Sequence, residues 1–168
     1  MFEGNVCIKR VKNNSIIKEY HFKNTILRRA KNPLFGRSSY TEDFTIRFYI
    51  YDSPISDEDY RNSYYSTYKY TVPGDYYFLG ELPPNGTSIG EFPIMIVDDS
   101  EGRHIISTTN TILGPQIIWG VGLEWYFKSP DYPYPLYRRS LAVLRLQSSV
   151  VFESDDSYVI QYKLSMRW

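Results

Sequence analysis

The C-terminal segment, 157-SYVIQYKLSMRW-168, alternates between apolar and polar side chains and indicates the fold class most clearly. One face carries Tyr158, Ile160, Tyr162, Leu164, Met166 and Trp168, and the other carries Ser157, Val159, Gln161, Lys163, Ser165 and Arg167. Successive side chains of a β-strand point to opposite faces of its sheet. The segment is therefore predicted to be a strand with one buried face and one largely solvated face.

The same alternation recurs upstream. Residues 44–51 place Phe44, Ile46, Phe48 and Ile50 on one face, and residues 117–127 do the same with Ile117, Trp119, Val121, Leu123, Trp125 and Phe127. Shorter candidate strands cover 6–11, 16–22, 64–72, 76–79, 92–97, 104–112, 136–146 and 150–152. Turn-forming tetrapeptides such as 12-KNNS-15 and 83-PPNG-86 separate them, and the first of these predicts an N-terminal hairpin.

Many short strands joined by such turns are typical of a sandwich, so the predicted fold is all-β, an antiparallel β-sandwich resembling a jelly roll. One short helix is predicted near residues 25–35, because Asn24 or Thr25 could cap a segment whose apolar residues recur at helical spacing. No repeat or long linker divides the chain. Residues 1–168 are therefore expected to form a single domain.

The charge balance limits the classes of partner. Lys and Arg total 19, Asp and Glu also total 19, and the formal net charge is zero. A nucleic-acid binder needs a basic excess to displace counterions from phosphates, so nucleic acid is not an expected partner. A protein without net charge also lacks long-range self-repulsion, which permits close packing of many copies.

Other features predict where the protein folds. Cys7 is the single cysteine, so no intrachain disulfide can form. The N-terminal residues lack the basic and apolar regions of a signal peptide, and no apolar run approaches the roughly 20 residues of a membrane helix. We expect a protein made in a reducing cytoplasm, with no membrane partner.

The motifs of common catalytic and cofactor sites are missing from the sequence, so no catalytic or cofactor-binding residue is predicted and the chain is expected not to be an enzyme. Cys7, His21 and His104 do not have the short spacings of a zinc site, and no metal site is predicted. Residues 57–59, Asp-Glu-Asp, could bind calcium, but a solvated acidic loop is the preferred interpretation.

The segment 129-SPDYPYPLYRR-139 is the strongest candidate for a partner-binding surface. Its alternating prolines hold the backbone extended, which lowers the entropy lost on docking. Tyrosine and arginine dominate binding hot spots, so the contact candidates are Tyr132, Tyr134, Tyr137, Arg138 and Arg139. The alternative is a stiff loop whose tyrosines pack on their own domain.

A second candidate surface is the tyrosine-rich strand predicted at 64–72. Tyr64, Tyr65 and Tyr68 place rings on both of its faces, which favours contact on both sides. A neighbouring subunit, a sugar bound to exposed rings, or loops of the same chain could supply the second contact.

The order of several motifs resembles a family of small structural proteins of tailed bacteriophages. The matching segments are 21-HFKNTIL-27 at the predicted helix, 119-WGVGL-123, 136-LYRR-139 and the closing strand 158–168. The central residues, about 40 to 110, depart from that pattern. The resemblance implies a virion protein of the tail, neck, baseplate or capsid surface, with other virion proteins and copies of itself as partners.

These observations lead to one preferred hypothesis, a structural subunit of a tailed-phage particle that acts through protein–protein assembly. The first alternative is a carbohydrate-binding β-sandwich module, in which exposed rings stack on sugars. A β-rich hydrolase is the second alternative, and it would require a pocket containing carboxylates with shifted pKa values.

Overall fold

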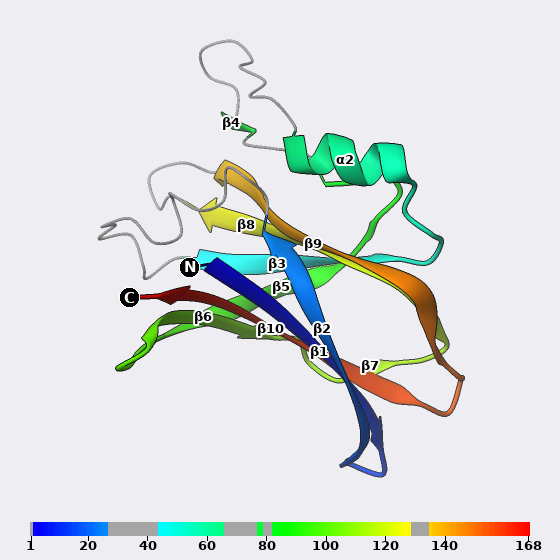
Figure 1. Cartoon of the computed structure of the whole chain (residues 1–168). Helices are drawn as coiled ribbons and strands as arrows, with labels where there is room; N and C mark the ends of the chain where they lie inside the picture. The colour runs from blue at the N-terminus through cyan, green and yellow to red at the C-terminus, as the bar shows by residue number, and fades with distance from the viewer. Residues whose placement is uncertain (1, 27–43, 66–76, 79–81, 129–134) are drawn as a thin grey trace.

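The computed structural model describes residues 2–26, 44–65, 77–78, 82–128 and 135–168, and these residues form an all-β fold (Figure 1). The strands are β1 (Phe2–Lys12), β2 (Ser15–Ile26), β3 (Phe44–Tyr51), β4 (Tyr77–Phe78), β5 (Thr87–Asp98), β6 (Gly102–Thr108), β7 (Ile112–Leu113), β8 (Gln116–Lys128), β9 (Pro135–Phe152) and β10 (Ser157–Arg167). The described helix is α2 (Asp57–Tyr65).

The sheet closes into an eight-stranded antiparallel barrel, so the prediction of a sandwich is wrong while the prediction of an antiparallel all-β fold is confirmed. The strand order is β1-β2-β9-β8-β3-β5-β6-β10, and β10 returns to pair with β1 along almost its whole length. The two chain ends therefore lie side by side, with Phe2 opposite Met166 (Figure 1). Closure gives every barrel strand two neighbours, whereas a sandwich would leave edge strands exposed.

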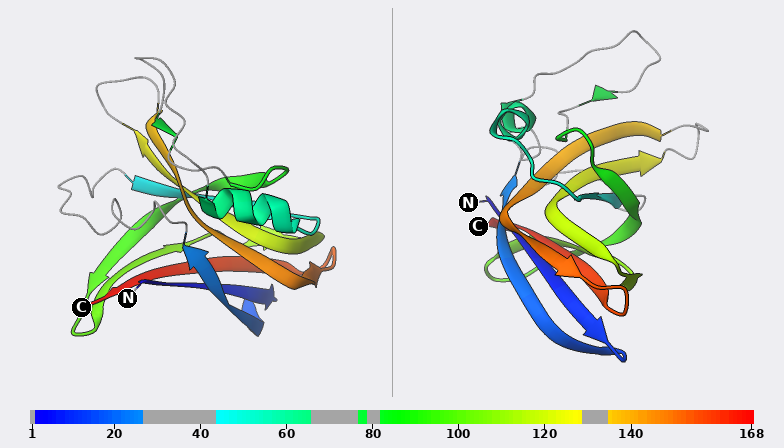
Figure 2. Two further views of the ribbon diagram at one scale, coloured as in Figure 1. Left: turned by 45° about the horizontal axis from the view of Figure 1, so that its top comes forward. Right: turned by 90° about the vertical axis from the view of Figure 1, so that its right-hand side faces the viewer.

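Two strands turn the sheet by changing partners along their length. β2 pairs with β1 and then, at Thr25 and Ile26, with β9. β5 pairs with β3 up to Pro93 and with β6 from Ile94 onwards. Beside the bulge in the β3–β5 pairing lies Gly90, whose φ of 129° a residue with a side chain rarely adopts. These changes of partner curve the sheet until its first and last strands meet (Figure 2).

The N-terminal hairpin is confirmed. Asn13 and Asn14 connect β1 to β2 with φ values of 50° and 60°. A two-residue hairpin turn needs positive φ at both central positions, and asparagine tolerates that conformation better than most residues do. The hairpin tip projects from the lower end of the barrel in Figure 1.

The barrel interior is filled by side chains. The alternation predicted for β10 is confirmed from Tyr158 to Leu164, whose inward side chains are almost completely buried. Beyond them Met166 is half-buried and Trp168 is 71% exposed, so the buried face of β10 ends before the C-terminus. An eight-stranded barrel has an interior just wide enough for its own side chains.

The helix predictions need correction. Residues 25 and 26 belong to β2, and the rest of the predicted helix at 25–35 lies outside the described residues. The acidic residues 57–59, interpreted as a loop, form the first turn of α2. Ser56 caps this helix, because its Oγ accepts a hydrogen bond from the Asp59 N–H at 3.1 Å. None of the described helices has the length and apolarity that a membrane crossing needs.

A smaller apolar cluster lies outside the barrel, between the sheet and α2. Tyr51, Ile55 and Val143 are buried there, and Leu82 packs against them. Gly120 on β8 has no side chain and so leaves room for Ile55, since a Cβ at that position would lie 2.7 Å from Ile55 Cδ1. α2 is held across the sheet by an ion pair between its Asp57 and Arg145 of β9, 2.5 Å long.

Candidate functional site on the barrel exterior

The structure places the predicted contact residues in three groups. Tyr68, Tyr132 and Tyr134 lie outside the described residues. Tyr64 and Tyr65 form the end of α2, so the strand predicted from residue 64 is wrong at its first two positions. Tyr137, Arg138 and Arg139 lie in β9, where their backbones pair with Phe127, Tyr126 and Trp125 of β8. Their contact with partners stays a prediction.

A row of four opposed residues, three of them apolar, crosses four strands at the end of the barrel that carries the β1–β2 hairpin. Leu113 of β7 lies opposite Ser157 of β10, Ser157 lies opposite Val11 of β1, and Val11 lies opposite Ile16 of β2. Directly opposed residues share a face, and this face is the outside because the next residue, Tyr158, is buried. Leu113 is 78% exposed and Ile16 is 54% exposed.

A second exposed apolar pair lies on β8 and β9. Ile117 and Val151 are opposed, and both point away from the core. The sequence pattern predicted the reverse for β8, with Ile117 on the same face as Val121. A bulge between Ile118 and Gly120 shifts the alternation, so Ile118 is buried and Ile117 is outside. The aliphatic residues of the row and of the pair are together called the apolar surface below: Val11, Ile16, Leu113, Ile117 and Val151.

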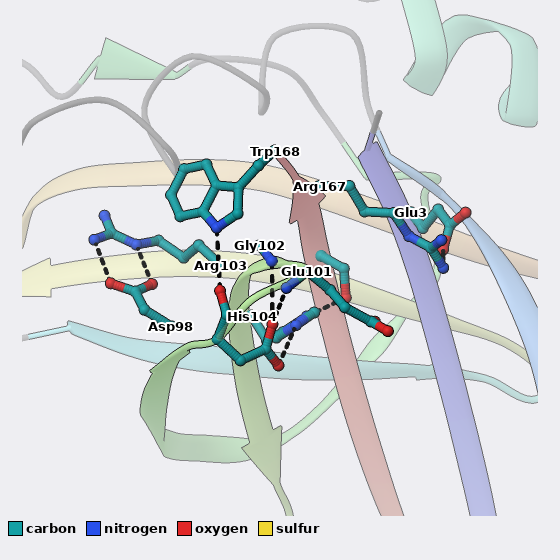
Figure 3. A network of polar contacts seen from close by, with 10 residues as sticks. Glu3, Asp98, Glu101, Gly102, Arg103, His104, Arg167 and Trp168 are labelled. Atoms are coloured by element: carbon teal, nitrogen blue, oxygen red, sulfur yellow. Dashed lines mark hydrogen bonds and ion pairs between the residues drawn. The ribbon is translucent and has the colours of Figure 1, made fainter.

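A polar network holds the C-terminus against the β5–β6 turn (Figure 3). His104 on β6 is buried between two partners, with its Nδ1 2.8 Å from Ser165 Oγ and its Nε2 3.0 Å from Asp99 Oδ2. The Trp168 indole N–H donates to the Asp99 carbonyl at 3.1 Å. Backbone N–H groups of Glu101 and Gly102 donate to the Asp99 carboxylate.

These donors hold the pKa of Asp99 below its ordinary value. The Glu101 N–H contributes most, and the hydrogen bond and charge of His104 add to it. The neighbouring pKa of Asp98 is also lowered, because Arg103 donates two hydrogen bonds to its carboxylate at 2.7 and 2.8 Å. Both carboxylates are therefore charged at neutral pH.

The contacts from Ser165 to His104 and from His104 to Asp99 follow the order found in a hydrolase triad, in which a carboxylate orients a histidine that activates a serine. Ser165 is only 4% exposed, however, and it lies on a strand whose next residues anchor the C-terminus. A substrate has no access to its hydroxyl in this arrangement. We interpret the network as a clamp between β10 and the β5–β6 turn.

An open groove of about 580 Å³ lies on the outer face of β2, β1 and β10. Three rows of opposed residues line it: Lys23, Asn5 and Lys163; His21, Cys7 and Gln161; and Glu19 and Lys9. Cys7 Sγ lies 4.0 Å from His21 Nε2, and the same nitrogen lies 3.0 Å from Glu19 Oε2. Linear spacing does not reveal this cluster, because only the hairpin pairing brings Cys7 close to Glu19 and His21.

The chain matches no protein-family model, no curated protein and no solved structure. The surfaces described above are therefore interpreted from their own geometry and chemistry.

Proposed function

We propose that this protein acts by assembly with other protein subunits, as a structural component of a tailed-phage particle. The observation that carries the assembly proposal is the apolar surface, in which five strands each contribute one aliphatic side chain and four of these side chains are exposed. Isolated apolar residues are common on protein surfaces, but an exposed group of them marks a site of interaction.

The closed barrel restricts how a partner can bind. Each of the eight barrel strands pairs with two others, but β2 pairs with β9 only at Thr25 and Ile26, so strand addition is disfavoured where both edges of a strand are paired. At those positions contact uses side chains on the barrel exterior. Fully burying a Leu or Ile side chain there stabilises a complex by about 1.5–3 kcal/mol. Because the formal net charge is zero, copies of the chain do not repel one another over long distances.

The virion role rests on the order of sequence motifs. Two of the four motifs, 119–123 and 136–139, lie on the adjacent strands β8 and β9, and the closing motif, 158–168, lies almost entirely in β10. The first motif departs from the resemblance, since residues 24–26 continue β2 where the family pattern has a helix. We propose that partners are copies of this chain and neighbouring virion proteins, with Tyr132, Tyr134, Tyr137, Arg138 and Arg139 as further contacts.

The assembly proposal is tested by light scattering of the purified full chain over a range of concentrations. Leu113→Ser together with Ile117→Ser should weaken self-association at least about tenfold, because both apolar side chains are lost from the proposed contact. The fold should be retained, because both side chains are exposed and their removal leaves no cavity in the core. The matched control is Met95→Ser with Val97→Ser, two exposed apolar residues on β5. Equal effects of both double variants, or a wild-type chain that stays monomeric at all concentrations and binds no particle protein, would overturn the assignment of this surface.

The virion role is tested by quantitative peptide mass spectrometry of gradient-purified particles from the source. Hundreds of copies relative to the major capsid protein indicate a capsid-decorating or tail-shaft subunit, and a few dozen or fewer indicate the neck or baseplate. Absence from the particle would reject the virion role. Binding of the isolated monomer to a glycan array would then favour the carbohydrate-binding alternative.

A further inference from the structure

We propose that Cys7, Glu19 and His21 form a surface site for a divalent transition metal of the Zn²⁺ class, with an open coordination position facing the groove on β2, β1 and β10. Their ligand atoms all lie within 4.8 Å of one another, and this is the one such group of His, Cys and acidic side chains among the described residues. The inference does not depend on the assembly proposal.

The β1–β2 hairpin builds the site. Cys7 and His21 are directly opposed across the two strands, and Glu19 lies two residues before His21 on the same face of β2. Opposed side chains of an antiparallel pair have Cβ atoms about 4.5–5.5 Å apart, which suits two ligands of one ion. The hairpin register, set by the Asn13–Asn14 turn and by the register shift between Arg10 and Val11, therefore positions all three side chains.

The donor separations are close to those of a tetrahedral zinc site. Bond lengths of about 2.0–2.3 Å put tetrahedral ligand atoms roughly 3.3–3.7 Å apart. Here Sγ and Nε2 are separated by 4.0 Å, and Nε2 and the Glu19 oxygen by 3.0 Å. Shifts of less than about 1 Å, within the rotamer freedom of exposed side chains, would bring the three atoms around one ion.

The arrangement does not fit a nucleophilic cysteine. In a Cys–His–carboxylate relay the thiol and the carboxylate contact different ring nitrogens, so that a proton can pass through the imidazole. Here the thiol and the carboxylate both approach Nε2 of His21, as ligands that converge on one point do.

The donor set selects the class of metal. A thiolate and an imidazole favour Zn²⁺, Co²⁺ or Cu over Mg²⁺ and Ca²⁺, which prefer oxygen ligands. Binding would displace the Cys7 proton, so affinity should increase with pH. The ammonium groups of Lys9, Lys23 and Lys163 line the same groove and oppose a cation, but they would favour an anionic fourth ligand once the metal is bound.

The test is a Co²⁺ titration of the reduced full chain, followed by absorbance, with Zn²⁺ competition and calorimetry for affinity. We expect one ion per chain and a thiolate-to-cobalt charge-transfer band that Zn²⁺ abolishes. Cys7→Ser should remove the band, and His21→Ala and Glu19→Gln should each weaken Zn²⁺ binding at least about tenfold.

Two controls distinguish a specific metal site from nonspecific metal binding. Glu153→Gln, at an exposed glutamate in the β9–β10 turn, should leave affinity unchanged, and Lys9→Ala should tighten binding by removing a nearby positive charge. Circular dichroism of each variant checks the fold. The proposal is overturned if the wild-type protein gives no charge-transfer band, if Cys7→Ser binds Zn²⁺ as tightly as wild type, or if Glu153→Gln weakens binding as much as Glu19→Gln.

Discussion

Arg47 is expected to be the most important charged residue for stability among the described side chains. It lies on β3 between two glutamates on neighbouring strands, Glu91 of β5 and Glu124 of β8. Its guanidinium pairs with the Glu91 carboxylate and lies 3.8 Å from Glu124 Oε1, which also accepts a hydrogen bond from Tyr49 at 3.3 Å. Burial alone would lower the pKa of Arg47, but hydrogen bonds to Glu91 and Tyr49 outweigh it and keep the side chain charged.

The size of the effect follows from the burial of Glu124, whose side chain is only 7% exposed. At an effective dielectric constant of about 20, two unit charges 3.8 Å apart interact by about 4 kcal/mol. Solvent around the partly exposed Arg47 screens some of this energy. Arg47→Met keeps the aliphatic stem, removes the charge and leaves two carboxylates facing one another. We expect the free energy of unfolding to fall by about 3 kcal/mol.

Urea unfolding followed by tryptophan fluorescence measures this change. The matched control is Arg103→Met, which breaks the exposed pair with Asp98 and should lower the free energy of unfolding much less than Arg47→Met does. Glu124→Gln added to Arg47→Met should recover part of the loss, because the buried carboxylate is then neutral. Equal losses for Arg47→Met and Arg103→Met, or no recovery in the double variant, would refute the reasoning.

Three further predictions concern other parts of the fold. Gly120→Ala should destabilise the protein by about 1–3 kcal/mol in urea unfolding, because its Cβ would lie 2.7 Å from the Leu144 carbonyl oxygen; an unchanged midpoint would contradict this. Ser56→Ala removes the cap of α2 and should cost about 1 kcal/mol in the same assay, whereas Ser56→Asp should retain most of the stability. The lowered pKa of Asp99 contributes stability that is present above its unfolded-state pKa of about 3.9 and is lost as the pH falls through the folded-state pKa. Asp99→Asn should therefore make unfolding free energy fall less steeply below about pH 4, and an unchanged slope would argue against this contribution.

Local chemistry made several features predictable from the sequence. The alternation from Tyr158 to Leu164 predicted a buried face, because the period of a strand is fixed by its pleat. The pair Asn13–Asn14 predicted a hairpin, because few residues adopt positive φ. The cap of α2 also has a local signal, Ser56 followed by Asp59, that was overlooked among neighbouring acidic and tyrosine residues.

The candidate sites could not be predicted in the same way, because they depend on register. A single bulge after Ile118 moves Ile117 from the core to the surface, and no pattern in the sequence marks it. The cluster of Cys7 and His21 arises from cross-strand pairing, and His104 meets Ser165 through the pairing of β6 with β10. Such contacts are set by which strands are neighbours, which the linear spacing of residues does not specify.

The sequence by itself determined that the chain forms antiparallel strands, and it determined the inner and outer faces where the alternation is unbroken, as from Tyr158 to Leu164, since both properties follow from side-chain alternation and turn residues. Only the tertiary structure decided that these strands close into a barrel. Closure requires β1 and β10, at opposite ends of the chain, to pair, and it requires β2 and β5 to bend and exchange partners. A strand with one apolar face satisfies a sandwich and a barrel equally well, so the choice rests on long-range pairing between strands that are distant in the sequence.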